Sequence, residues 1–248
     1  MTWFGHDGPS LAGELGLPRV EAYAALASTM DEAHRLAAEG APAGTMVLAE
    51  AQTRGRGREG RRWMSRPGAG LWVTMIERPS DPEAVAALSL RVGLALAPVL
   101  ERWSEGAVSL KWPNDLFVGE GKLAGVLVEA RWRGDRPDWV AVGVGVNLVA
   151  PEEVAVPTAH LGPVAPVELL RATSAAIRGA AAAVGPLTPR ERDTFTARDL
   201  AAGRAIVEPV PGLARGIAAS GALLVETAAG LSAHASGSLI FASTKEGR

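Results

Sequence analysis

The amino-acid sequence predicts an α+β protein, with a mixed, largely antiparallel sheet, packed helices and a small C-terminal β-barrel. Three observations support this. Short apolar runs bounded by turn residues recur between residues 45 and 148. Apolar residues at helical spacing occupy 82–103 and 167–200, and beyond residue 201 short β-runs alternate with glycines. We therefore expect a larger domain at 1–198 and the barrel at 199–248.

A helix is expected to begin at Ser28-Thr29. Thr29 and Glu32 have the spacing of a capping box, apolar residues follow at helical spacing, and Gly40 ends the helix. Hydroxyl groups at a helix N-terminus cap it, and beside free N–H groups they can equally bind a polar ligand. Before this helix, only residues 20–26 have a pattern, which predicts a short strand or helix.

The middle of the chain predicts one helix among several strands. Apolar residues from 82 to 103 predict a core-facing helix that Pro98 kinks or shortens. A turn is expected at 113–115 and a hairpin loop at 119–122. The predicted strands are 45–49, 71–76, 108–111, 116–118, 123–132 and 140–148.

The last third predicts two helices and then the barrel. The helices are expected at 167–184 and 189–200, the second with proline at its first position. Short runs separated by glycines are typical of a small barrel. The predicted barrel strands are 205–210, 214–218, 223–226, 231–233 and 238–241.

The composition argues against several classes of protein. With 25 basic and 27 acidic residues the net charge is −2, which gives no overall reason to expect nucleic-acid binding. The absence of cysteine excludes disulfides and thiolate chemistry and fits a cytoplasmic location, and four isolated histidines do not predict a zinc site. We expect no secretion signal and no membrane span, because no apolar run is long enough.

The segment from 51 to 63 carries the strongest chemical signal. Guanidinium forks bind phosphate or carboxylate, and glycines let backbone N–H groups approach the same anion. We therefore expect an anion site with a nucleotide as its ligand; the alternative is a solvated basic loop that repels itself. The residues concerned are Arg54, Gly55, Arg56, Gly57, Arg58, Gly60, Arg61 and Arg62.

Two familiar nucleotide motifs do not explain this segment. Gly55, Gly57 and Gly60 match the dinucleotide fingerprint in spacing, but that fingerprint must open a helix, and Pro67-Gly68 follow instead. A P-loop sequence does not occur anywhere in the chain.

Three segments stand out when the chain is taken in order: Gln52–Trp63, Lys111-Trp-Pro-Asn-Asp115 with Lys122-Leu-Ala-Gly125, and Gly143-Val-Gly-Val-Asn147. Together they resemble the signature of biotin–protein ligases, and the resemblance covers the chain from about Ser28 to Phe241. The resemblance implies a class II synthetase-like catalytic domain at 1–198. It also implies the activity: activation of biotin with ATP as biotinyl-5′-AMP, then transfer to a lysine of a biotin carboxyl carrier domain, as in acetyl-CoA carboxylase. Mg²⁺ is expected with ATP, although no acidic cluster locates it.

The resemblance also implies roles for individual residues. Lys111 and Arg58 would be catalytic, with Lys111 between the biotin carboxylate and the α-phosphate. Expected biotin-binding residues are Ser28, Thr29, Met30, Gln52, Gly55, Arg56, Gly57, Arg58, Lys111 and Gly125. Expected nucleotide-binding residues are Arg56, Arg58, Arg61, Trp63, Lys111, Asn114, Lys122 and Asn147.

Some of these residues have structural alternatives. Trp63 could belong to the core, Asn114 could only form a turn, and Asn147 could only cap a strand. Met30 stands where many relatives carry asparagine, so any contact there with biotin would use the backbone.

Three other functions compete with the ligase. A lipoate–protein ligase shares the chemistry, and a biotin sensor would share the binding site without needing cations directed at phosphate. Nucleic-acid binding through the segment from 51 to 63, the arginine loop, is disfavoured by the net charge and by the lack of interleaved aromatic residues. The 27 residues before Ser28 are too few for a helix-turn-helix, so no DNA binding is expected. The sequence leaves open whether the protein is a homodimer.

Overall fold

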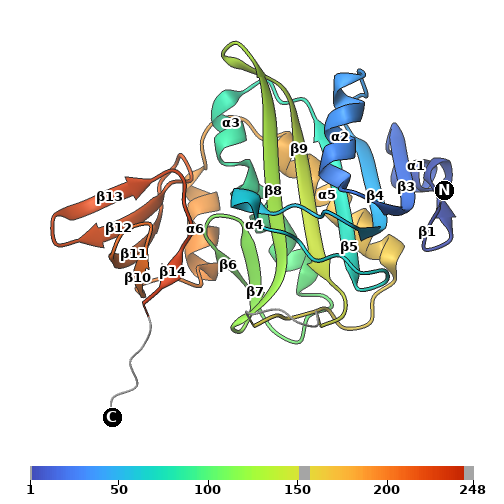
Figure 1. The fold of residues 1–248 in the computed structure, drawn as a ribbon. Coiled ribbons are helices and arrows are strands. Elements are labelled where there is room, and N and C mark those ends of the chain that lie inside the picture. The colour runs from blue at the N-terminus through green and yellow to red at the C-terminus, as the bar shows by residue number, and fades with distance from the viewer. Residues whose placement is uncertain (1, 151–156, 243–248) are drawn as a thin grey trace.

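The computed structural model describes residues 2–150 and 157–242 and contains two large sheets (Figure 1). In the main sheet all neighbouring strands are antiparallel except β3 and β4, which are parallel. Its strands, in spatial order, are β3 (Arg19–Leu26), β4 (Thr45–Gln52), β5 (Gly70–Glu77), β9 (Arg136–Asn147), β8 (Gly121–Arg133), β7 (Asp115–Val118) and β6 (Val108–Lys111). The prediction of a mixed, largely antiparallel α+β fold is therefore confirmed.

Helices cover both faces of the main sheet. They are α1 (Gly8–Leu15), α2 (Thr29–Ala38), α3 (Pro82–Ala86), α4 (Leu88–Leu100), α5 (Pro166–Ala181) and α6 (Pro189–Arg198). Because side chains alternate along a strand, neighbouring residues of β4 join different cores: Val47 packs with α2, whereas Met46 and Leu48 belong to the larger core with α4 and α5. Helix α2 covers only part of the sheet face on which it packs, and the candidate site lies on the uncovered part.

The N-terminal part differs from the sequence prediction. Residues 20–26 lie in a strand, β3, and the chain before it forms a small hairpin, β1 (Thr2–Trp3) with β2 (His6–Asp7), followed by α1. These elements were missed because Gly8, Pro9 and Gly13 weaken the helical signal of α1. The side chain of Asp7 caps this helix by accepting a hydrogen bond from the Ser10 amide.

The predicted capping box at Thr29 and Glu32 is wrong. Ser28 occupies the N-cap position and its side chain makes no capping hydrogen bond. Glu32 instead accepts hydrogen bonds from the Tyr23 hydroxyl and from Arg35. The hydroxyl groups at the start of α2 are therefore not used by the helix.

The single helix expected at 82–103 is also wrong in detail. It divides at Ala87 into α3 and α4, and α4 continues past Pro98 to Leu100. Pro98 has no N–H to donate to the preceding turn, so it costs α4 one hydrogen bond, and the helix ends two residues later. In the part of the chain described, no helix is long and apolar enough to cross a membrane.

The C-terminal strands form a five-stranded antiparallel sheet beside α6 (Figure 1). Trp112 is buried and donates from Nε1 to the Gly221 carbonyl at 3.0 Å, and the Leu200 amide donates to the Leu110 carbonyl at 2.9 Å. These bonds tie the smaller sheet to the main one. The strands, in spatial order, are β13 (Gly230–His234), β12 (Leu223–Thr227), β11 (Gly212–Ile217), β10 (Ala205–Glu208) and β14 (Ile240–Phe241).

Candidate active site

A cavity of about 610 Å³ lies on the main-sheet face that α2 only partly covers. Its floor includes one cross-strand row, in which each residue is paired in register with the next: Lys111, Asp115, Gly125, Gly145 and Trp72. The register thus brings residues from the second and third segments of the sequence signature to one place.

Trp63 lies directly above the glycines of this row. A Cβ atom at Gly145 would be 2.6 Å from Cε2 of Trp63, and one at Gly125 would be 2.9 Å from its Cζ3. The ring of Trp72 lies edge-on to Trp63, with centroids 6.2 Å apart, and the Lys122 ammonium lies 4.9 Å from the Trp63 ring centre. Positions 125 and 145 must therefore be glycine because the Trp63 indole leaves no room for a side chain there.

Neutral polar groups line the cavity beside the start of α2. Gln52 Oε1 accepts hydrogen bonds from the Thr29 amide at 2.8 Å and from the Thr29 hydroxyl at 3.1 Å. The Ser28 hydroxyl is buried and has no hydrogen-bond partner, although it lines the cavity. A buried hydroxyl without a partner costs free energy, so this position is suited to a polar ligand atom.

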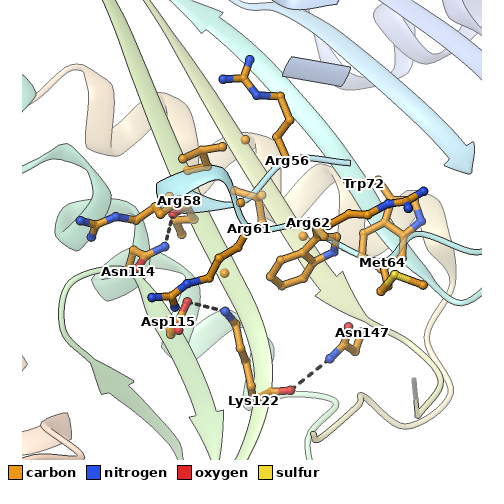
Figure 2. A pocket seen from close by; sticks show the side chains of 18 of the residues that line it. Arg56, Arg58, Arg61, Arg62, Met64, Trp72, Asn114, Asp115, Lys122 and Asn147 are labelled. Carbon is orange, nitrogen blue, oxygen red and sulfur yellow. Dashed lines mark hydrogen bonds and ion pairs between the residues drawn. The ribbon is translucent and has the colours of Figure 1, made fainter. Parts of the chain in front are cut away.

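The arginine loop covers the cavity, and its arginines point in different directions (Figure 2). Arg56 extends away from the other arginines and pairs with Asp31 at 2.7 Å and Glu129 at 2.6 Å. Arg58 and Arg61 point toward the side of Asn114 and Asp115. A 3-10 turn at Arg58–Gly60 creates this divergence, with Glu59 at a left-handed φ of 55°.

Two of these arginines contact the C-terminal sheet region. Arg58 donates to the Gly237 carbonyl at 3.4 Å, and Arg61 donates to the Ser238 hydroxyl at 2.6 Å. Burial lowers the pKa of Arg58, because no carboxylate is close enough to compensate fully. An anion entering the cavity would stabilise the buried, charged Arg58 guanidinium.

Two lysines flank one carboxylate on the cavity floor. Lys122 pairs with Asp115 at 2.7 Å, while the Lys111 ammonium lies 5.3 Å from the Phe241 ring centre (Figure 2 shows the Lys122–Asp115 pair). Burial lowers the pKa of Lys111, and the Asp115 carboxylate only partly opposes this shift. Three further cations add to the lowering: Lys122, Arg61 and Arg204.

The two asparagines of the signature hold backbone in place. Asn114 donates from its amide to the Val126 carbonyl at 2.7 Å. Asn147 donates to the carbonyl groups of Lys122 at 3.0 Å and Ala159 at 3.1 Å. Both residues also line the cavity, and their side-chain nitrogens are engaged by these backbone carbonyl groups.

The C-terminal part of the chain supplies one wall that the sequence did not predict. Leu200, Arg204 and Phe241 line the cavity, and the Arg204 guanidinium lies 3.6 Å from the Phe241 ring centre. This stacking places a cation beside Lys111. Only the tertiary contact between the two sheets could have indicated these residues.

The structure brings together all but one of the site residues expected from the sequence. Gly55 is the exception: it does not line this cavity, and a Cβ atom there would lie 2.4 Å from the Trp63 carbonyl oxygen. Arg62, expected as part of the anion site, also lines the cavity. The lining residues that were given no role from the sequence include Trp72, Thr74, Asp115, Phe117, Leu127, Gly143, Arg204 and Phe241. Strand alternation would have found Thr74 and Gly143 had the register of β5 and β9 been known, because the two residues are cross-strand partners.

Among the described residues, no three histidine, aspartate or glutamate side chains come together as a metal site. The acidic side chains in the described lining are Asp115 and Glu120. Since Lys122 already pairs with Asp115, a divalent cation here would depend on oxygen atoms supplied by a bound ligand.

Comparison with known proteins identifies relatives. Residues 24–147 match the family described as the biotin/lipoate A/B protein ligase family. A solved structure of the biotin protein ligase from Aquifex aeolicus, in complex with biotin and ATP, is 27% identical, with a TM-score of 0.73. That comparison covers 89% of this chain and 97% of that chain.

Curated relatives match part of the chain. The bifunctional ligase/repressor BirA of Bacillus subtilis is 39% identical over 124 residues, which are 50% of this chain and 38% of that protein. The biotin–[acetyl-CoA-carboxylase] ligase of Mycobacterium tuberculosis is 37% identical over 147 residues, covering 56% of this chain and 53% of the relative. The family match spans half of the chain and contains the cavity-floor glycines, the arginine loop and both lysines, so this protein belongs to the biotin/lipoate A/B protein ligase family.

Proposed function

We propose that this protein is an ATP-dependent biotin–protein ligase. One observation carries the proposal: a single cavity joins a neutral polar side at Ser28, Thr29 and Gln52 to a strongly cationic side at Lys111 and Arg58. The first side fits an uncharged ring with hydrogen-bonding groups. The second fits the phosphates of ATP and the carboxylate with which they react.

The proposed reaction has two steps. An oxygen of the biotin carboxylate attacks the α-phosphorus of ATP, and the bond from that phosphorus to the pyrophosphate oxygen breaks, which yields biotinyl-5′-AMP and pyrophosphate. The neutral amine of a carrier lysine then attacks the acyl carbon, the bond to AMP breaks, and the amine loses a proton. Neither step needs a nucleophile from the enzyme, so the work of the site is positioning and charge stabilisation.

The cations of the cavity have distinct proposed roles. Lys111 would stabilise negative charge on the carboxylate and on the α-phosphate, and Arg58 would close over both from the loop. Arg61 would bind phosphate, and Lys122, held by Asp115, would lie at the nucleotide side near Trp63. Arg56 would contact biotin and the adenylate after leaving Asp31 and Glu129.

The remaining expected residues have less direct proposed roles. Trp63 would form one wall for adenine, while Asn114 and Asn147 would act mainly through the backbone that they hold. Met30, Gly57 and Gly125 would border biotin, Met30 through its backbone. Mg²⁺ would enter bound to the ATP phosphates and neutralise charge there, with Asp115 and Glu120 as the nearby carboxylates.

We also propose the domain division 1–198 for catalysis and 199–248 for a C-terminal domain that closes the nucleotide side of the cavity. The positions of Arg204 and Phe241 in the lining support this division. Carrier proteins of the proposed kind would be biotin carboxyl carrier domains, such as that of acetyl-CoA carboxylase.

The test is pyrophosphate release from Mg-ATP with biotin, repeated with lipoate, followed by mass measurement of an isolated carrier domain. Release with biotin and a mass gain of one biotinyl group on the carrier lysine are expected. Release with lipoate alone would move the protein to the lipoate branch of its family. Biotin binding without pyrophosphate release would instead indicate a biotin sensor.

A further inference from the structure

The polar side of the cavity contains a hydrogen-bond chain whose direction can be worked out atom by atom. The chain runs from the Thr74 hydroxyl to the Thr29 hydroxyl at 2.8 Å, then to Gln52 Oε1 at 3.1 Å. From the other end of the same amide, Gln52 Nε2 donates to the Ser65 hydroxyl at 2.9 Å.

A backbone N–H sets the direction of this chain. The Thr29 amide can only donate, so the Gln52 atom that faces it at 2.8 Å must be the oxygen. That oxygen can only accept, so the Thr29 hydroxyl must donate its proton to it. In its second hydrogen bond the Thr29 oxygen must then accept, and Thr74 must be the donor.

We infer that Thr74 is a positioning residue: by donating to Thr29 it holds the Thr29 hydroxyl in the orientation that the backbone N–H sets, so that this wall selects a ligand with adjacent N–H and C=O groups, such as a cyclic urea. The inference rests on the proposed function and deepens it. With its proton directed to Gln52, the Thr29 oxygen keeps a lone pair that accepts from a ligand N–H. The second N–H of Gln52 Nε2 remains to donate to a ligand carbonyl.

The surroundings of Thr74 make this polarity stable. Thr74 is buried, with 1% of its surface exposed, and it lies in the cavity lining. Its cross-strand partner is Gly143, and a Cβ atom there would lie 2.9 Å from Cε of Met30 and in ordinary contact, at 3.5 Å, with the Thr74 hydroxyl. The Thr74 proton therefore has a fixed acceptor in Thr29, and water does not compete for it.

This wall discriminates between the two kinds of substrate in the family. The bicyclic ring of biotin carries a urea, which offers N–H donors and a carbonyl acceptor. The dithiolane ring of lipoate offers neither, so it would leave the remaining Thr29 lone pair and the second Gln52 N–H without partners. Leaving buried polar groups unpaired is costly, which makes the wall selective against the lipoate ring.

The test compares Thr74→Val, which keeps the shape and loses the hydroxyl, with Thr74→Ser, which keeps the hydroxyl. Calorimetry with the full chain measures the affinity for biotin and for desthiobiotin, which retains the urea. Since the Thr29 hydroxyl loses its donor, we expect about tenfold weaker binding of both ligands to Thr74→Val. Thr74→Ser should bind both within about twofold of the unchanged protein. The KM for ATP and the kcat at saturating biotin should stay unchanged in both variants.

Thr45→Val is the matched control. Thr45 is also a buried threonine on a strand, its hydroxyl has no partner, and it lies outside the cavity lining. It should leave biotin affinity unchanged. Equal biotin affinity in Thr74→Val and the unchanged protein would overturn the inference while leaving the ligase proposal intact, as would a loss that Thr74→Ser does not restore. Failure of the unchanged protein to bind biotin at all would overturn both.

Discussion

Trp63 and Gly145 are in direct contact: the indole lies where a side chain at position 145 would be, with only 2.6 Å between Cε2 and an ideal Cβ. The indole also covers Gly125 in the neighbouring strand. The floor and the roof of the cavity are therefore fitted to each other, and a change in the floor must displace the loop that carries Trp63.

Gly145→Ala should lower kcat/KM for biotin-dependent pyrophosphate release by at least about tenfold, because displacement of Trp63 misplaces the reacting groups. Steady-state kinetics and a thermal melt measure the effect, and the melt should show a much smaller change. Gly13→Ala in α1 is the matched control, since no heavy atom lies within 4 Å of its ideal Cβ. Normal kinetics in Gly145→Ala would show that Trp63 can move without consequence.

Lys111→Ala should reduce pyrophosphate release by about 10²–10³-fold, the range found when one group that stabilises transition-state charge is removed. Stability should hardly fall, because burial disfavours the charged lysine in the folded protein. Single-turnover adenylation and chemical denaturation measure the two effects separately. A large loss of folding stability in Lys111→Ala, in step with the loss of adenylation, would contradict the assigned role.

The pH dependence of adenylation should also reflect Lys111. Its folded-state pKa lies below the ordinary value of 10.5, so the required ammonium is lost as pH rises through this lowered value. Activity should therefore fall on the alkaline side earlier than an ordinary lysine would allow. Lys111→Arg keeps its charge at high pH, and any residual activity of that variant should lack this alkaline decline.

Asp199 should make stability fall as the pH rises from about 4 to about 6. Burial raises its pKa from 3.8 to about 6, so the folded protein holds this proton more tightly than the unfolded chain does. At pH 7.5 the ionised group then costs about 2 kcal/mol, after allowance for partial contact with solvent. Asp199→Asn, which retains an oxygen for the Ala201 amide, should be more stable by about that amount at pH 7.5. Chemical denaturation at pH 7.5 and at pH 4 should show that the difference in stability between Asp199→Asn and the unchanged protein largely disappears near pH 4.

The arginine loop should become harder to cleave when biotin and Mg-ATP bind, because an anion lets its guanidinium groups gather. Glu129→Gln removes one of the two carboxylates that hold Arg56, so trypsin should cut the loop of this variant faster in the absence of ligand. Glu39→Gln is the control, since it breaks an exposed pair with Arg35 in α2. Equal cleavage of the loop with and without ligands would contradict the idea of closure.

Sequence patterns predicted the main elements and most of the site because those signals are local. The strands around the arginine loop and the Lys111–Asp115 turn carry their own apolar runs and turn residues. Thr74 and Arg204 were missed because their importance depends on strand register and on contact between two sheets. The capping box failed for a related reason: Tyr23 and Arg35, which take up Glu32, could not be placed beside it from spacing alone.

The lysine pair on the cavity floor has a practical consequence. The chain contains 25 basic residues, but only Lys111, Lys122 and Lys245 are lysines, and the last lies outside the described residues. In the part that the structure describes, side-chain amines thus occur only in the cavity. Reagents that acylate amines would report directly on whether the cavity is filled. Mass spectrometry of peptides labelled at Lys111 or Lys122 would give a footprint of substrate binding, free of background from a lysine-rich surface.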